Sequence, residues 1–223
     1  MAKDFEHPKV VTGYDQHIRK LIPGYMLMHA QIRASLNVHL MQSAHLLIVG
    51  CGTGYEVQYL LESFPNLCIT AVDPSQKMLQ YAQQRIQALP GADRVQFVHG
   101  TTADLEFKPQ FDAALSLLVA HFIPIEQKPD FFQQIYRRLK TNAILMTYDL
   151  CLAQDATELK TLQNLCKEQG LSDQQTEQMV ARLDSDFALV DPIYYQNMLL
   201  DAGFKDIYRY IQVINYFGFL ATK

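Results

Sequence analysis

Residues 45–56 read His-Leu-Leu-Ile-Val-Gly-Cys-Gly-Thr-Gly-Tyr-Glu, and the rest of the chain can be placed relative to this stretch. The apolar run from Leu46 to Val49 leads directly into three alternating glycines, and helix-forming residues follow from Glu56. This order predicts a buried parallel strand, a tight turn and a helix. The glycines permit positive φ and let a ligand approach the backbone at the positive end of the helix. The stretch therefore predicts a ligand-binding turn.

A second apolar run, Cys68 to Val72, ends in Asp73, at the distance expected of a carboxylate that accepts hydrogen bonds from two ribose hydroxyls. The turn departs from the dinucleotide pattern Gly-x-Gly-x-x-Gly, because its third glycine is Gly54 and Tyr55 stands where that pattern needs glycine. Val-Gly-Cys-Gly-Thr-Gly followed by Val-Asp-Pro-Ser instead resembles the class I S-adenosylmethionine-dependent methyltransferases. The resemblance implies an enzyme that uses S-adenosyl-L-methionine as its methyl donor.

The composition is that of an ordinary globular protein. With 223 residues, 49% of them hydrophobic and 19% charged, the chain suits one large domain. A net charge of −4 argues against a sequence-independent nucleic-acid surface. The four cysteines show no Cys-x-x-Cys spacing, so we expect reduced thiols rather than a metal site, with Cys51 and Cys68 in buried core or turn positions. The sequence shows no signal peptide and no bilayer-spanning apolar stretch, which predicts a cytoplasmic protein without a membrane partner.

The hydrophobic pattern divides this single domain into segments. Residues 1–12 are polar and aperiodic, which is typical of a mobile arm, and apolar residues then recur at helical spacing on both sides of Pro23. A polar helical stretch interrupted at Gly170 predicts a lid, and Asp191 predicts the N-cap of a last helix. The expected segments are an N-terminal helical cap (1–42), a cofactor-binding core (43–150), a helical lid (151–190), and a final helix with a hairpin (191–223).

Strands that alternate with helices imply a parallel sheet with right-handed crossovers, whose ligands bind at the carboxyl ends of the strands. We therefore predict an α/β, Rossmann-like class I methyltransferase fold with a seven-stranded, mostly parallel sheet. Residues 204–213 and 216–222 would complete the sheet as a C-terminal antiparallel hairpin. The predicted strand ends carry candidate binding residues: Gly50, Asp73, Thr101, Ser116 and Asp149.

The resemblance to methyltransferases assigns cofactor roles to several of these positions. Backbone groups of the glycine-rich turn would hold the methionine end, and Asp73 would accept the ribose hydroxyls, unless it only caps the following helix. Many relatives carry an acid where this chain has Thr101, so Thr101 or Thr102 would contact the adenine, with Asp104 as a fallback. Met78 would line the adenine pocket, or else belong to the core at helical spacing.

Two residues are candidates for catalysis. His121 follows the fourth predicted strand, and an imidazole near neutral pKa can remove a proton from an oxygen or nitrogen nucleophile. The alternative is a packed, hydrogen-bonded histidine beside Phe122. Asp149 ends the fifth strand as a second candidate acid, with capping of the next helix as its alternative. Methyl transfer itself asks for little acid–base help, because the sulfonium is already activated and alignment supplies most of the acceleration.

Most of the chain also resembles a narrower group, the carboxy-S-adenosylmethionine synthases of tRNA wobble-uridine modification and their methyltransferase cousins. The resemblance is carried by Ile-Arg-Lys-Leu-Ile-Pro-Gly-Tyr at 18–25, Gly-Cys-Gly at 50–52, Asp-Ala-Gly-Phe at 201–204 and Asn-Tyr-Phe-Gly-Phe-Leu-Ala-Thr-Lys at 215–223. It implies a homodimer, because the synthases form homodimers. It also implies cofactor contacts at Tyr25, Gly50, Cys51, Gly52, Asp73, Pro74, Thr101, Thr102 and Ser116.

Two positions depart from the synthases. Met198 stands where they use an arginine to pair with the carboxylate of their modified cofactor, and a thioether cannot neutralise that charge. Ser116 stands where they have asparagine. Both differences favour an ordinary methyltransferase that acts on a small-molecule acceptor, while a synthase and a non-catalytic cofactor-binding dimer stay open as alternatives. Tyrosines are expected to line the acceptor pocket: Tyr14, Tyr25, Tyr148, Tyr194 and Tyr195.

Overall fold

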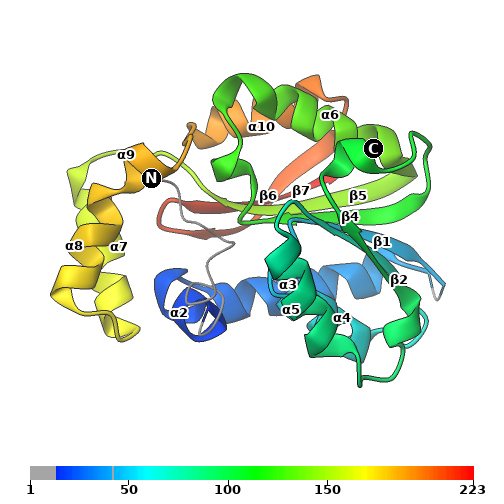
Figure 1. Cartoon of the computed structure of the whole chain (residues 1–223). Helices are drawn as coiled ribbons and strands as arrows, with labels where there is room; N and C mark the ends of the chain where they lie inside the picture. Colours follow the sequence, from blue (N-terminus) through cyan, green and yellow to red (C-terminus); the bar gives the residue numbers. More distant parts are fainter. Residues whose placement is uncertain (1–13, 42) are drawn as a thin grey trace.

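The computed structural model describes residues 14–41 and 43–223, and its centre is a seven-stranded sheet (Figure 1). The strand order is β3-β2-β1-β4-β5-β7-β6, and all neighbours from β3 to β5 are parallel. β7 runs antiparallel to both β5 and β6, which confirms the predicted sheet and its final hairpin. The strands are β1 (His45–Val49), β2 (Cys68–Asp73), β3 (Val95–His99), β4 (Phe111–Leu117), β5 (Leu139–Leu150), β6 (Lys205–Val213) and β7 (Tyr216–Thr222).

Helices cover both faces of the sheet (Figure 1). One face packs against α3 (Tyr25–His39), α4 (Tyr55–Ser63) and α5 (Gln76–Ile86), and the other against α6 (Lys128–Arg138) and α10 (Pro192–Asp201). Two apolar clusters result, one on each face, and the central strands β1 and β4 contribute to both. Because both faces are covered, these strands are continuous apolar runs rather than alternating ones.

The N-terminal cap consists of α2 (Tyr14–Leu21) and α3, which are separated at Pro23 and Gly24 as predicted. Gly24 adopts a φ of 71° at the start of α3, a conformation that glycine takes without strain. The Tyr148 hydroxyl of β5 donates a 2.8 Å hydrogen bond to the carbonyl of Pro23, so the bend is fixed to the sheet. The expected arm over residues 1–12 lies outside the described residues.

The segment predicted to be a lid, called the lid below, follows β5 and contains α7 (Ala156–Glu168), α8 (Asp173–Ala181) and α9 (Leu183–Asp186). Figure 1 shows these helices in yellow tones beyond one end of the sheet, on the side of α2. Asp155 caps α7 and Ser172 caps α8 with a capping box, which explains why helices restart after the breaks in the pattern. In the described part of the chain, the helices are too short or too polar to span a membrane.

The turn between β1 and α4, residues 50–54, is called the glycine turn below. All three of its glycines have positive φ, namely 69°, 52° and 78° for Gly50, Gly52 and Gly54. The surroundings of the last two differ. A Cβ at Gly54 would lie 2.7 Å from the Cβ of Ala82 in α5, whereas a Cβ at Gly52 would meet no atom within 4 Å. Gly54 is therefore required for packing, and Gly52 leaves an open face.

This difference predicts unequal costs of alanine at the two positions. Gly52→Ala carries only the left-handed backbone penalty, about 1–2 kcal/mol of unfolding free energy. Gly54→Ala adds overpacking against Ala82 and should cost roughly 2–5 kcal/mol in total. Urea unfolding of the two variants beside the parent protein measures both values. Equal losses at the two positions would contradict the close helix packing at Gly54.

Candidate functional site

The glycine turn is joined to the end of β2 through Asp73. The amide of Gly52 donates to Oδ2 of Asp73 at 2.8 Å, and the amide of Ser75 donates to Oδ1 at 2.9 Å. The amides of Gly50 and Cys51 both donate to the carbonyl of Val72. The N-cap of α5 is Ser75, whose hydroxyl accepts from the amide of Met78. Ser75 rather than Asp73 is therefore the N-cap of this helix, and Asp73 joins the glycine turn to the start of α5.

Two features beside this turn fit a bound polar ligand. The position of a Cβ at Gly52 faces open space, so a ligand can approach this backbone. Ser116, near the end of β4, is fully buried, and its hydroxyl has no hydrogen-bond partner in the described part of the chain. A buried hydroxyl without a partner is unfavourable, and a ligand group is one way to satisfy it. The residues present thus suit a nucleoside-type cofactor with several hydrogen-bonding groups.

The loops after β2 and β3 place the remaining predicted cofactor residues. The carbonyl of Pro74 accepts a 3.0 Å hydrogen bond from the His99 ring. The amide and hydroxyl of Thr101 donate to Asp104, and these bonds lower the pKa of the Asp104 carboxyl. Asp104, the fallback adenine ligand, is therefore engaged in holding its own loop.

Met78 and Thr102 are both 3% exposed. Met78 lies outside the two apolar clusters that the described residues form, although it is on the buried side of α5. Met78 is nevertheless one of the buried hydrophobic residues of the described chain, as the core alternative for this position expects. Cys51 is also buried, and its sulfur lies 4.0 Å from the carbonyl of Gly52.

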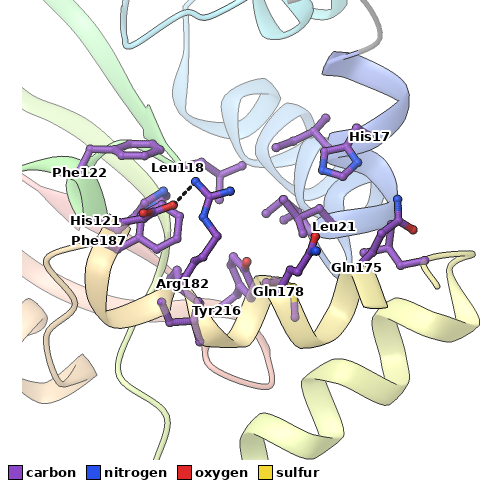
Figure 2. Close-up of a pocket in the computed structure, with 17 residues that line it drawn as sticks. His17, Leu21, Leu118, His121, Phe122, Gln175, Gln178, Arg182, Phe187 and Tyr216 are labelled. Carbon is purple, nitrogen blue, oxygen red and sulfur yellow. Dashed lines mark ion pairs between the residues drawn. The ribbon is translucent and has the colours of Figure 1, made fainter. Parts of the chain in front are cut away.

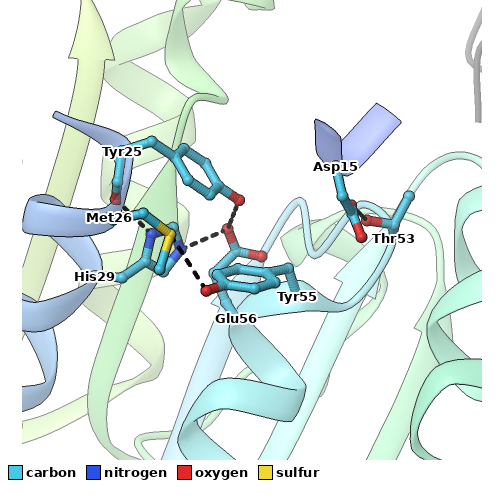
Figure 3. A network of polar contacts seen from close by, with 7 residues as sticks. All are labelled: Asp15, Tyr25, Met26, His29, Thr53, Tyr55 and Glu56. Atoms are coloured by element: carbon cyan, nitrogen blue, oxygen red, sulfur yellow. Dashed lines mark hydrogen bonds and ion pairs between the residues drawn. The ribbon is translucent and has the colours of Figure 1, made fainter. Parts of the chain in front are cut away.

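A polar network connects the cap helix α3 to α4 (Figure 3). Oε1 of Glu56 accepts from the Tyr25 hydroxyl at 3.3 Å and lies 3.0 Å from Nε2 of His29. Nδ1 of His29 donates to the carbonyl of Tyr25 at 2.8 Å, because a carbonyl can only accept. Sequence reasoning found Tyr25 and missed its two partners. The signal was present, since His29 lies four residues after Tyr25 on the same helix face and Glu56 is the second residue after the glycine turn.

A second contact ties α2 to the glycine turn, and sequence reasoning missed it as well. The Thr53 hydroxyl donates to Asp15 of α2 at 2.7 Å (Figure 3). Arg85 of α5 forms an ion pair with the same Asp15, and its Nε donates to the carbonyl of Thr53 at 2.8 Å. The cap, the glycine turn and α5 are therefore held together at one point. No sequence motif links residues this far apart.

A cavity of about 320 Å³ lies between α2, the lid and the loop that leaves β4. Figure 2 shows His121 and Phe187 at one side of it, His17 and Gln175 at the opposite side, and Arg182 between them. Arg182 forms an ion pair with Asp186 of α9. Most of the other lining side chains are leucine, isoleucine, methionine or phenylalanine.

The loop from Leu118 to His121 borders both this cavity and the glycine turn. Leu118 and His121 line the cavity, whereas a Cβ at Gly50 would lie 2.5 Å from a methyl group of Val119. Leu118 has a φ of 60°, which is unfavourable for a residue with a Cβ. Its amide donates to the carbonyl of Tyr148 at 2.6 Å, which holds this conformation. This short loop thus faces both the glycine turn and the cavity.

His121 is held by a buried carboxylate. Its Nδ1 lies 2.8 Å from Oδ1 of Asp149, and the Tyr195 hydroxyl donates to Oδ2 at 2.8 Å. Asp149 is fully buried behind His121 and does not line the cavity, and the cap of the following helix is Asp155 instead. Burial, and then the charge of Asp149, raise the pKa of Tyr195 well above its usual value, so this phenol stays a neutral donor.

Lys128 of α6 binds the backbone of the loop that contains His121. Its ammonium group donates to the carbonyl of Ile123 at 2.8 Å and to that of Ala120, and its side chain is 1% exposed. Burial lowers the pKa of Lys128, and the charge of Asp149 opposes this effect. The two carbonyls flank His121 in sequence, so Lys128 fixes the backbone on both sides of it.

The tyrosines expected in the acceptor pocket do not line this cavity, as far as their side chains are described. Tyr25 binds Glu56, Tyr148 binds the carbonyl of Pro23, and Tyr195 binds Asp149, while Tyr194 is exposed on α10. The side chain of Tyr14 lies outside the described residues. The tyrosine that lines the cavity is Tyr216, from β7, which the sequence placed only in a hairpin. The spacing of tyrosines in the sequence does not show toward which side their side chains point in the fold.

Met198 is 2% exposed and belongs to the apolar cluster under α6 and α10. The position where the synthases carry an arginine is thus part of the core here, which suits a methionine.

The cysteines differ in exposure, and the expectation of a buried Cys68 was wrong, because Cys68 begins β2 and is exposed. The other three thiols are buried. Burial raises the pKa of Cys51, with Asp73 adding to the effect, and burial raises the pKa of Cys166 to about 11.

A thiolate-selective reagent should therefore modify one thiol rapidly in the native chain and all four after unfolding. Cys68→Ser should remove the rapid phase of labelling. The absorbance of the coloured thiol that a disulfide reagent releases on reaction with a cysteine follows this phase. Rapid labelling of the Cys68→Ser protein would contradict the buried state of the other three.

The comparisons with known proteins agree with this geometry. Residues 46–142 match the protein family described as "Methyltransferase domain". Over 233 aligned residues, the chain is 25% identical to carboxy-S-adenosyl-L-methionine synthase of Campylobacter concisus, covering 100% of this chain and 96% of the relative. It is 26% identical to the enzyme of the same name from Campylobacter hominis, with the same coverage.

A solved structure of Haemonchus contortus phosphoethanolamine N-methyltransferase 2, in complex with phosphomonomethylethanolamine and S-adenosylhomocysteine, superimposes with a TM-score of 0.72. The two chains are 17% identical, and the match covers 100% of this chain and 61% of that one. Residues 46–142 therefore match a methyltransferase family, and the whole chain has the fold of the class I S-adenosylmethionine-dependent methyltransferases. Within that class, the chain is similar over its whole length to the carboxy-S-adenosyl-L-methionine synthases.

Proposed function

We propose that this protein transfers a methyl group from S-adenosylmethionine to a small-molecule acceptor bound in the cavity between α2, the lid and the loop after β4. The observation that carries the proposal is the loop from Leu118 to His121, which faces the glycine turn on one side and the cavity on the other. A donor at the turn and an acceptor in the cavity would meet beside this loop. Such alignment of the two molecules is the main requirement of methyl transfer.

When bound, S-adenosylmethionine supplies a methyl carbon whose bond to the sulfonium breaks as the bond to the acceptor forms, leaving neutral S-adenosylhomocysteine. The glycine turn would bind the methionine end through its backbone, with Cys51 as a buried neutral wall. Asp73, at the end of β2 beside the glycine turn, would accept the ribose hydroxyls, and Ser116 would gain the partner that its hydroxyl lacks. Met78, Thr101 and Thr102 are assigned to the adenine side.

The size of the cavity supports a small acceptor. Its volume of about 320 Å³ stands at the lower end of the range of roughly 300–1,000 Å³ typical of small-molecule sites. The net charge of −4 also disfavours a nucleic-acid acceptor. His121 is assigned to proton removal from the acceptor, and Asp149 to orienting the His121 ring. A cytoplasmic homodimer is part of the same proposal, on the strength of the similarity to the synthases.

The assignment of Asp73 predicts that Asp73→Ala weakens S-adenosylmethionine binding by at least about tenfold, or 1.4 kcal/mol. Titration calorimetry of the purified chain with S-adenosylmethionine measures the change. Asp112→Ala is the matched control, because Asp112 lies near the start of β4, at the end opposite to the glycine turn. There it forms an ion pair with Lys140 and accepts a hydrogen bond from the backbone amide of His45. Its affinity should stay within about twofold of the parent. Unchanged affinity in Asp73→Ala would remove Asp73 from the ribose role.

A second candidate function is carboxy-S-adenosylmethionine synthesis, which the full-length similarity to those enzymes favours. Met198 speaks against it, because this position is apolar and buried and offers no cation for a carboxylate on the sulfonium substituent. Mass spectrometry of the cofactor extracted from freshly purified protein separates the two functions. We expect unmodified S-adenosylmethionine or S-adenosylhomocysteine, and a carboxylated sulfonium compound would establish the synthase reaction instead.

A further inference from the structure

We propose that the acceptor is an uncharged, largely apolar molecule with a weakly acidic hydroxyl group, and that His121 takes the hydroxyl proton on its Nε2. This inference rests on the proposed function, since it assigns the chemistry of the acceptor cavity. It is carried by three observations: the orientation of the His121 ring, the paired charges of the lining, and the apolar character of the remaining wall.

The orientation of His121 follows from its partners. Asp149 can only accept hydrogen bonds when ionised, and the Tyr195 hydroxyl already donates to its second oxygen. The Nδ1 of His121, 2.8 Å from the first oxygen, is therefore the protonated nitrogen of the neutral ring. Nε2 then carries the lone pair, and it has no hydrogen-bond partner among the described residues. Because the ring lines the cavity, this lone pair is the basic group that an acceptor can reach.

The charges of the lining are balanced without a ligand. Arg182 and Asp186 form an ion pair 2.5 Å apart, and the Asp186 side chain is only 7% exposed. An anionic acceptor that displaced Asp186 from Arg182 would leave a buried carboxylate uncompensated, and one that approached without displacing it would lie near the Asp186 charge. A cationic acceptor would likewise have to take Asp186 from Arg182. An acceptor without net charge leaves the pair intact.

The rest of the cavity wall is mainly apolar. Ten of the seventeen lining residues are isoleucine, leucine, methionine or phenylalanine, and Phe122 and Phe187 pack beside His121 with ring centroids 4.4 and 5.0 Å from its own. Apolar area of this kind favours a hydrophobic body in the ligand. Uncharged polar groups come from Gln175, Gln178 and Tyr216. A ring or short chain with one hydroxyl matches this distribution.

The proton transfer is balanced within the site. The O–H bond of the acceptor breaks as the N–H bond at Nε2 forms, and the oxygen uses the freed electron pair for the bond to the methyl carbon. The resulting imidazolium of His121 lies against the Asp149 carboxylate, which stabilises its charge. His121 returns to the neutral form by releasing the proton to water after the product leaves. Tyr195 and Lys128 act as positioning residues, because they contact Asp149 and the loop rather than the ligand.

Three probes of similar shape test this inference: 4-nitrophenol, which has an acidic hydroxyl and a coloured phenolate, 4-nitroanisole, which has no acidic proton, and 4-nitrobenzoate, which is an anion. Equilibrium dialysis at mildly acidic pH, where 4-nitrophenol is protonated in water and 4-nitrobenzoate is still an anion, measures their affinities for the full chain. Both uncharged probes should bind at least about tenfold more tightly than 4-nitrobenzoate. Met179→Trp, which fills the lid side of the cavity, should abolish binding of the uncharged probes.

The absorbance of bound 4-nitrophenol reports the proton transfer itself. In the parent protein, its half-ionisation pH should fall below the value in water, because His121 accepts the proton and remains beside the phenolate. In His121→Gln, the half-ionisation pH should rise above the value in water, since an apolar cavity without a base disfavours the phenolate. The charged and titratable groups that face His121 are Asp149 from β5, Tyr195 from α10, Lys128 from α6, and the Arg182–Asp186 pair of the lid.

Three outcomes would overturn the inference: equal or tighter binding of 4-nitrobenzoate, no binding of either uncharged probe, or a half-ionisation pH that is the same in the parent and in His121→Gln. None of these measurements uses S-adenosylmethionine. A protein that fails to bind S-adenosylmethionine in calorimetry but ionises 4-nitrophenol through His121 would disprove the proposed function and leave the cavity chemistry standing. Circular dichroism of both variants confirms that they are folded.

Discussion

The hydrogen bond from the amide of Gly52 to the carboxylate of Asp73 is the contact on which the site depends. It joins the turn after β1 to the end of β2, and it requires a backbone that only glycine adopts easily at a φ of 52°. The same turn is also tied to α2, because Asp15 accepts from the Thr53 hydroxyl and pairs with Arg85, which donates to the Thr53 carbonyl. Helix α2, the glycine turn and the Asp73 carboxylate therefore form one connected unit rather than separate parts that a ligand would have to assemble.

The parts of this fold that the sequence predicted are those with a local physical cause. The run before Gly50 is buried on both faces and therefore continuous, Asp191 and Pro192 start α10 by capping, and the break at Pro23 separates α2 from α3. Asp73 could be found because its distance from the turn is set by one helix and one strand. In each case neighbours in the chain determine the outcome.

The parts that could not be predicted depend on residues far apart in the sequence. Asp149 contacts His121, 28 residues earlier, and Tyr195, 46 residues later. These partners meet only after β5 pairs with β4 and α10 packs on the sheet. The exposure of Cys68 and the placement of Tyr216 at the cavity have the same origin. Side-chain direction at a strand end follows from register, which composition and spacing do not specify.

The lid supplies nearly half of the cavity wall, from Leu171 to Phe187, yet the glycine turn and Asp73 are built entirely from the strands and helices before it. It is also an insertion between β5 and α10, two elements whose packing on the sheet involves their own side chains. If donor and acceptor bind as proposed, substitutions in the lid would alter the choice of acceptor while the donor site stays intact. A scaffold divided in this way can acquire a different product through changes in a single segment.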